Sequence, residues 1–223
     1  MKTKLTLKVL VLLTTLIAIL FPFIPANAAG LTDAPTIAAS AVVLPAFEKF
    51  VATVQTDQAG VMRGVYVPGV FAFRVAQQPY DMPGFVSTME NTVTQFRMAA
   101  QYGTIGILAH NYLAGASFTN LAVGQEIRIV YGDSKVAYYK VNGIYRYQAL
   151  QPNSQTSNLK NLDTGDTYSV QDIFTKFYQG GDNVTFQTCI ETDGISTWGR
   201  LFVTAAPFTP EKVNQSVLIY FHN

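Results

Sequence analysis

The chain has 223 residues, of which 15 are basic and 14 are acidic, and 49% are hydrophobic. It contains no basic tract and no lysine-rich patch, so nucleic acid is not an expected partner. A chain of this length suits a single domain with a sizeable core.

The first 28 residues have the pattern of a signal peptide. Three lysines precede an apolar run over residues 9–24, and Ala26 and Ala28 are the small residues that a signal peptidase reads. We predict cleavage after Ala28, which leaves 12 of the 15 basic residues against 14 acidic ones. The apolar run has about 16 residues, fewer than the roughly 20 of a spanning helix. An uncleaved membrane anchor is the alternative, and only then is a membrane expected as a partner. Either way we expect an exported protein, extracellular or at the cell surface.

We divide the remaining chain into a lead-in with a first strand, residues 29–59, and a barrel domain, residues 60–223. Short runs of β-branched and aromatic residues, bounded by Gly, Asn, Asp or Pro, predict strands. These runs cover residues 47–55, 60–67, 69–76, 103–109, 126–131, 135–142, 144–149, 183–190, 200–205 and 217–221. A hairpin is expected at residues 131–134 and a tight turn at Asn142-Gly143.

Two segments are predicted to be helical. Residues 84–102 have apolar residues at helical spacing, and residues 169–178 begin with a Ser cap three residues before Asp172. Residues 151–166 are polar and are expected to form a surface connection. Many strands with few helices favour a mainly β fold, either a closed barrel or a sandwich.

Cys189 is the only cysteine. In an exported chain, an odd cysteine points to intermolecular pairing or to a free reactive thiol, whereas the alternative is a buried small hydrophobe. Strand alternation places Cys189 on one face with Thr185 and Gln187, and Val184 and Phe186 on the other. A cysteine on the polar face of its strand favours the reactive thiol.

Two further residues could serve that thiol. His110 closes an apolar strand and can hold a proton and return it to a leaving amine. Arg200 opens the strand after Cys189 and can stabilise an oxyanion or orient a substrate carbonyl. A neighbouring imidazole or cation also favours the thiolate. His222, next to the C-terminus, is set aside as a site residue. We predict additional substrate contacts for Thr188 and Asn111.

The chain order narrows the class of enzyme. Papain-like peptidases place the cysteine before the histidine, whereas here His110 precedes Cys189 by 79 residues. L,D-transpeptidases have the observed order but carry His-Gly before their cysteine, where this chain has Gln187-Thr188.

The remaining pattern resembles the sortases, a family of exported bacterial cysteine transpeptidases. Residues 185–189, Thr-Phe-Gln-Thr-Cys, are similar to that family's Thr-Leu-x-Thr-Cys signature, and Arg200 follows at the start of the next strand. Residues 118–126 resemble the turn that follows the family's histidine strand. The similarity covers residues 102–207, and residues 148–181 form an insertion where sortases shape their substrate groove.

This resemblance implies a sortase-like closed β-barrel of about eight strands. It also implies that Cys189 cleaves a sorting-signal peptide of the Leu-Pro-x-Thr-Gly type through a thioester. The acyl group then passes to an amine of the cell wall or of another protein, or to water. His110 would be the general acid and base, and Arg200 would orient the substrate. A non-catalytic exported β-barrel that binds a surface protein or a glycan is the alternative, because the chain is rich in aromatic residues.

No cofactor is expected. Some sortases bind calcium, and residues 163–166 form an acidic, turn-like segment. It lacks the twelve-residue loop ending in Glu that would make a calcium loop, because Phe174 stands at the twelfth position. A solvated turn is the preferred interpretation, and a calcium site stays open.

Overall fold

The computed structural model describes residues 43–211. The predicted signal peptide, His222 and the predicted strand at residues 217–221 lie outside this part of the chain. The described elements are α1 (Phe47–Val54), β1 (Met62–Val67), β2 (Phe71–Gln77), β3 (Thr92–Phe96), α2 (Arg97–Ala100), β4 (Ile105–Leu108), the 3-10 helix η1 (Ala114–Asn120), β5 (Glu126–Tyr131), β6 (Val136–Ala149), β7 (Leu159–Asn161), β8 (Thr167–Tyr168), α3 (Val170–Tyr178), β9 (Val184–Thr192) and β10 (Ile195–Pro207).

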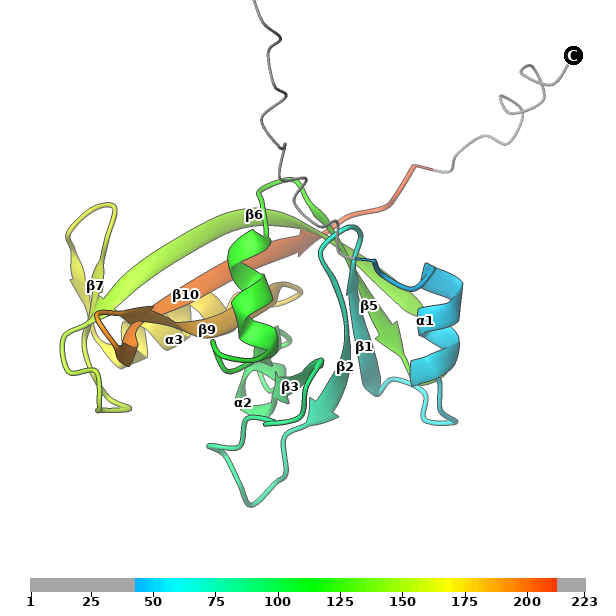
Figure 1. The fold of residues 1–223 in the computed structure, drawn as a ribbon, viewed down its shortest axis with the longest axis horizontal. Helices are drawn as coiled ribbons and strands as arrows, with labels where there is room; N and C mark the ends of the chain where they lie inside the picture. Colours follow the sequence, from blue (N-terminus) through cyan, green and yellow to red (C-terminus); the bar gives the residue numbers. More distant parts are fainter. Residues whose placement is uncertain (1–42, 212–223) are drawn as a thin grey trace, which may run out of the picture. The chain divides into compact units, whose positions relative to one another are not determined.

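Eight of the strands close into a ring. The hydrogen-bonded order is β10-β9-β4-β3-β2-β1-β5-β6, and β6 pairs again with β10, so this ring has no free edge. β6 and β10 are the long strands that run side by side in Figure 1. β7 and β8 extend the sheet beyond β6. The predicted closed barrel of about eight strands is therefore confirmed.

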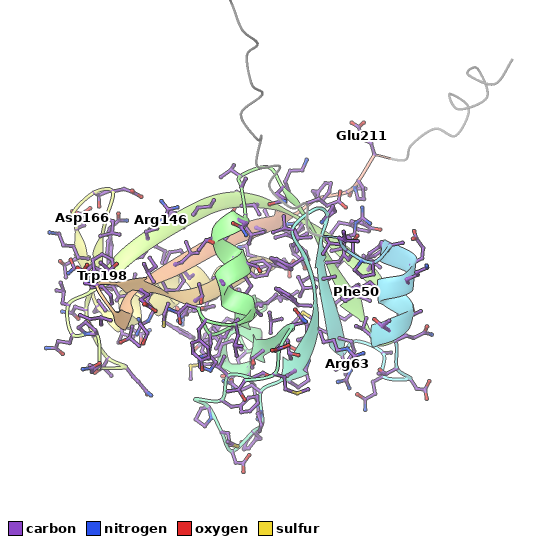
Figure 2. The ribbon with its side chains drawn as sticks, in the orientation of Figure 1. Phe50, Arg63, Arg146, Asp166, Trp198 and Glu211 are labelled. Carbon is purple, nitrogen blue, oxygen red and sulfur yellow. The ribbon has the colours of Figure 1, made fainter. Side chains whose placement is uncertain are left out.

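The apolar residues form a core inside the barrel and two clusters on its outer surface. Inside lie fully buried side chains such as Val65, Ile107, Ile129 and Phe186. A second cluster packs α3 onto the outer face of β6 and β10, where the Phe177 and Phe202 rings stack with centroids 4.2 Å apart. A third packs α1 onto the outer face of β1 and β5, where Figure 2 labels Phe50.

Three predicted elements were wrong. Residues 47–55 were expected to form a strand, but Phe47, Phe50 and Val54 are spaced for a helix, and α1 buries Phe50 and Val54 against the barrel. Residues 84–102 were expected to form one helix. Instead the β-branched run from Thr92 forms β3, which is parallel to β2 and antiparallel to β4, and only α2 is helical.

The third error concerns β6, which is one strand rather than two strands joined by a turn. Thr204 pairs with Gly143 and Ala205 pairs with Val141, so Asn142 is the extra residue of a β-bulge. Its Oδ1 accepts a hydrogen bond of 2.7 Å from the Thr204 hydroxyl. The polar connection at residues 151–166 also contains β7, which sequence reasoning missed. The predicted helix at residues 169–178 is confirmed as α3, capped by Ser169.

Candidate active site

Cys189 is a half-buried free thiol near the end of β9. β9 and β10 are antiparallel, and their register sets Cys189 directly opposite Arg200. Residues directly opposite in an antiparallel pair lie on the same face of the sheet, with Cα atoms about 4.5–5.5 Å apart. The predicted juxtaposition of these two residues is therefore present. Phe186, earlier on β9, points into the core, so alternation along the strand places Gln187 and Cys189 on the outward face. Arg200, opposite Cys189, lies on the same face.

His110 lies beside the same pair of strands. β4 runs parallel to β9, with Leu108 paired with Gln187, and the Ala109 amide donates to the Gln187 carbonyl over 3.3 Å. β4 ends at Leu108, and the same register extended two residues past that end would place His110 alongside Cys189. Neighbouring strands are about 4.8 Å apart. We call the three candidate residues His110, Cys189 and Arg200 the catalytic row; Cys189 and Arg200 are paired on β9 and β10, and His110 lies in the segment that follows β4.

Thr188 makes a hydrogen bond within the protein. Its side chain is only 3% exposed, and its hydroxyl donates a hydrogen bond of 2.9 Å to the carbonyl of Ala109. This bond joins the residue before the cysteine to the residue before the histidine. Thr188 therefore sets the spacing of the catalytic row, whereas a direct contact with substrate stays a prediction.

The approach of η1 supports the same spacing. A Cβ atom on Gly115 would lie 2.7 Å from the His110 carbonyl oxygen and 2.8 Å from that of Ala109, and it would also meet the Thr188 hydroxyl. No side chain fits there without displacing backbone. The Gly115 amide donates to the His110 carbonyl over 3.0 Å. Glycine at this position lets η1 close against the histidine loop.

Asn111 and Tyr112, the two residues after His110, make contacts that position the histidine loop. The Asn111 side chain donates a hydrogen bond of 3.1 Å to the carbonyl of Ser196, at the start of β10. The exposed Tyr112 ring stacks on the imidazole, with centroids 5.1 Å apart and an interplanar angle of 22°. Asn111 thus links the histidine loop to the arginine strand, and its predicted contact with substrate is untested. Tyr112 was missed, although an aromatic residue two positions after a histidine is a readable signal.

The Arg200 guanidinium is anchored to its own strand. Nη1 donates to the carbonyls of Thr197 and Gly199, over 2.9 and 2.8 Å. Within residues 43–211, the Nε and Nη2 groups have no hydrogen-bond partner, and neither has the Cys189 thiol. The guanidinium is therefore fixed at one nitrogen and keeps N–H donors available for a substrate oxygen.

A pocket of about 170 Å³ adjoins the catalytic row on the outward face. We call it the α3 groove, because Ile173, Phe174 and Tyr178 of α3 cover it. Its remaining lining is Phe96, Ser154, Gln155, Ser157, Leu159, Val170, Gln187, Arg200 and Phe202. Residues 151–181 thus supply most of its cover, where the insertion was expected to shape a substrate groove.

Gln187 presents a polar group to the α3 groove. Its Oε1 accepts a hydrogen bond of 2.5 Å from the Tyr178 hydroxyl. Burial raises the pKa of Tyr178 far above its usual value, so this phenol stays protonated and remains a donor. The acceptor of the Gln187 amide is thereby occupied. Its Nε2 has no partner in the described part of the chain and can donate to a ligand carbonyl.

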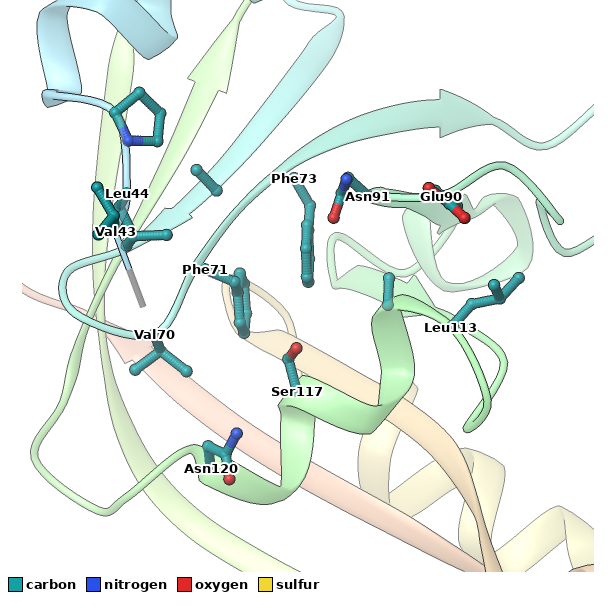
Figure 3. A pocket seen from close by; sticks show the side chains of 13 residues that line it. Val43, Leu44, Val70, Phe71, Phe73, Glu90, Asn91, Leu113, Ser117 and Asn120 are labelled. Atoms are coloured by element: carbon teal, nitrogen blue, oxygen red, sulfur yellow. The ribbon is translucent and has the colours of Figure 1, made fainter. Parts of the chain in front are cut away.

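A larger hollow of about 480 Å³ lies elsewhere, between β2, η1 and residues 43–45 (Figure 3). Phe71 and Phe73 form its apolar wall, and Ser117 and Asn120 of η1 line the opposite side. Neither Cys189, His110 nor Arg200 lines it. Its size alone therefore does not make it the reaction site.

The acidic turn at residues 163–166 is held by its own hydrogen bonds. Asn161 Oδ1 accepts from the amides of Asp163 and Thr164, and the Thr164 hydroxyl donates to Asp166. Among residues 43–211, no cluster of three or more His, Cys, Asp or Glu side chains is arranged to hold a metal ion. In the same range no helix has the length and apolarity that crossing a membrane requires.

Searches by sequence found no matching family model and no matching curated protein. The fold is similar to those of solved sortases. Sortase C1 from Streptococcus suis is 13% identical, with a TM-score of 0.43 over 73% of this chain and 78% of that one. A Clostridium perfringens sortase D5 transpeptidase is 17% identical, with a TM-score of 0.40 over 74% and 90%. Sortase A from Listeria monocytogenes is 14% identical, with a TM-score of 0.41 over 70% and 93%.

Proposed function

We propose that this chain is a sortase-like cysteine transpeptidase. The observation that supports the proposal most directly is the pairing of the free thiol of Cys189 with Arg200 on β9 and β10, beside the groove that Arg200 lines, with His110 just past the end of the neighbouring strand β4. These are the groups that acyl transfer through a thioester requires.

In the proposed reaction, Cys189 gives its thiol proton to His110, and its Sγ attacks a peptide carbonyl carbon of the donor. Arg200 stabilises the oxygen that becomes negative, using the N–H groups that Thr197 and Gly199 do not occupy. His110 gives a proton to the departing amine as the C–N bond breaks, which leaves a Cys189 thioester. The acceptor amine then attacks the thioester and gives its proton to His110, and the thiolate leaves. Water in place of the amine gives hydrolysis.

The α3 groove is the proposed seat of the donor peptide. Its lining is mostly apolar, and Gln187 Nε2 offers a donor for a backbone carbonyl close to Cys189. Such a combination suits an extended peptide, because the side chains fill apolar space while amides satisfy the backbone. A sorting signal of the Leu-Pro-x-Thr-Gly type on an exported protein is the proposed donor, and an amine of the cell wall or of a second protein is the proposed acceptor.

The first experiment tests whether the imidazole controls the thiol. A small thiol-directed reagent is reacted with wild type, His110→Ala and Cys189→Ser across the pH range in which an imidazole titrates. We expect rapid labelling of wild type, a loss of about tenfold or more in His110→Ala near neutral pH, and none in Cys189→Ser. Labelling that is slow in wild type and unchanged in His110→Ala would contradict catalysis.

Arginine substitutions supply a second, matched comparison. Cleavage of a peptide containing Leu-Pro-x-Thr-Gly is measured with Arg200→Gln and with Arg146→Gln, because Arg146 is exposed on β6 and lines neither the α3 groove nor the larger hollow. We expect Arg200→Gln to lower the rate by about 10² to 10³, the usual effect of removing an oxyanion donor. Arg146→Gln should behave as wild type. Equal rates for the two variants would remove Arg200 from the mechanism.

A non-catalytic binding barrel is the second candidate, and one observation favours it. Tyr80 and Tyr112 are 84% and 67% exposed, which is unusual for large aromatic side chains and common at binding surfaces. The labelling experiment separates the two, because a binding barrel gives Cys189 no dependence on His110.

A further inference from the structure

A third hollow adjoins the α3 groove at the end of β3. It has a volume of about 360 Å³ and we call it the Arg97 pocket. Its lining is Gln78, Pro79, Tyr80, Pro83, Phe96, Arg97, Met98, Gln101 and Tyr102. Phe96 also lines the α3 groove, so one side chain forms a wall of both.

Aromatic contacts connect the walls of the two hollows. The Phe96 ring packs edge-on against Tyr178 of the α3 groove, with centroids 5.1 Å apart. Tyr102 of the Arg97 pocket packs against Phe174 of the α3 groove at 5.7 Å. A ligand that leaves the α3 groove over Phe96 therefore meets the Arg97 pocket next.

The Arg97 pocket is held in shape by a buried amide. Gln78 is 7% exposed, and its Nε2 donates to the carbonyls of Pro83 and Phe85 over 2.9 and 3.0 Å. Its Oε1 accepts from the Arg97 backbone amide over 3.1 Å. These bonds fix the loop that carries Tyr80 against the start of α2. The pocket is thus formed before a ligand arrives, which lowers the entropic cost of binding.

Arg97 is a cation without an acidic partner. Its guanidinium lies over the Tyr80 ring, 3.7 Å from the centroid. Among residues 43–211, the salt bridges are Arg128–Glu126 and Lys135–Asp133, so Asp81, next to Tyr80, does not pair with Arg97. A guanidinium stacked on an aromatic ring is oriented and less hydrated, and its edge presents paired N–H donors that suit a carboxylate.

We propose that the Arg97 pocket binds an acidic side chain of the donor peptide, several residues N-terminal to the cleaved bond. This inference rests on the proposed function. The N-terminal part of the donor stays on Cys189 as the acyl group while the leaving peptide departs, so extended contacts are useful on that part. An extended chain advances about 3.3 Å per residue, so a few residues filling the α3 groove bring the next ones past Phe96 to Arg97.

The experiment uses the single cysteine as an anchor, so it does not depend on a known cleavage motif. Peptides carry a C-terminal disulfide, and the Cys189 thiolate attacks it, forming a mixed disulfide and releasing the other half as a thiol. Paired peptides differ only in having Glu or Gln at one of several positions upstream of the anchor. They compete for Cys189 at equilibrium under a mild thiol reductant, and mass spectrometry measures the ratio of the two adducts.

We expect the Glu peptide to be enriched about fivefold at one or two adjacent upstream positions. Arg97→Gln should remove the enrichment, and Arg146→Gln should retain it. Arg97→Glu should reverse the charge preference, so that a Lys peptide is enriched over a Gln peptide at the same positions. Misfolding could abolish a preference but could not create this new one. The backbone bond from Arg97 to Gln78 is unaffected by these changes.

The outcomes separate this inference from the proposed function. Equal adducts from Glu and Gln peptides, or enrichment that survives Arg97→Gln, would overturn the acidic site even if labelling of Cys189 depends on His110. If the enrichment depends on Arg97 but the labelling of Cys189 does not depend on His110, the proposed transpeptidase activity is overturned and a peptide-binding groove remains. Adducts from no peptide at all would overturn both. A glycan as the true occupant is indicated if soluble cell-wall sugars, and not the Glu peptide, protect Tyr80 from chemical modification.

Discussion

Thr188 shows how a single hydroxyl sets the geometry of the catalytic row. Its bond to the Ala109 carbonyl is buried and crosses between β9 and β4, the strands that carry Cys189 and lead to His110. Thr188→Val keeps the shape of the side chain and removes the donor, which leaves the Ala109 carbonyl without this partner. We expect a loss of about 1–3 kcal/mol in unfolding free energy, measured by urea denaturation, together with slower labelling of Cys189.

Thr188→Ser is the matched control, because it restores the hydroxyl. It should recover most of the labelling rate even if it loses some packing energy. If Thr188→Val labelled as fast as wild type, the bond would have no part in positioning the histidine loop.

At the same scale, the sequence predicted those site residues that depend on strand periodicity. Alternation along β9 placed Cys189 outward, and the short loop after it allowed Arg200 to lie opposite. Alternation alone could not show that Thr185, on the same outward face, is fully buried, because α3 covers it and the Phe177 carbonyl accepts its hydroxyl at 2.7 Å. Gly115 could not be found either, since its role depends partly on the close approach of η1 to Thr188, which lies far along the chain.

At the scale of elements, α3 was predictable because its start is encoded locally. Ser169 and Asp172 form a reciprocal capping box, and both partners are visible in the sequence. The errors at residues 47–55 and 84–102 have the opposite origin. Short runs of apolar residues fit the periodicity of a helix and that of a strand, so tertiary contacts decide which one forms. β3 is a strand because β2 and β4 flank it and pair with it.

The capping box gives a prediction for pH dependence. Hydrogen bonds from the Ser169 hydroxyl and amide lower the pKa of Asp172 below its usual value. Because the folded pKa is below the unfolded one, this contribution is fully present above the unfolded pKa and is lost as pH falls through the folded pKa. Ser169→Ala should therefore destabilise the protein near neutral pH, and less in acid. Thermal melts across acidic pH measure this, with Ser169→Thr as the capped control. A difference that stays constant into acid would contradict the linkage.

At the scale of the whole molecule, the barrel and the cover on its outer face, formed by α3 and the segment before it, can be altered separately. Cys189 and Arg200 stand on β9 and β10 of the closed ring, whereas the α3 groove is covered by α3 and the segment before it and has barrel residues such as Gln187 and Arg200 in its wall. What joins the cover to the barrel is the outer cluster centred on Phe177, which is 3% exposed and stacks on Phe202. The proposed reactivity of the thiol and the proposed binding of a peptide would therefore depend on different parts of the fold.

Phe177→Ala tests this division. Removing a buried aromatic ring costs about 3–5 kcal/mol, and we expect the folded variant to keep rapid, His110-dependent labelling of Cys189 by a small reagent while forming fewer peptide adducts. Phe177→Leu, a smaller change, should show the same pattern more weakly and guards against unfolding. Phe50→Ala is the matched control, because Phe50 is equally buried, at 4% exposed, but in the cluster under α1. It should lose stability and keep both activities. Parallel loss of labelling and peptide adducts in folded Phe177→Leu would mean that α3 also positions the catalytic row, because a cover that served only the peptide would leave the thiol unchanged.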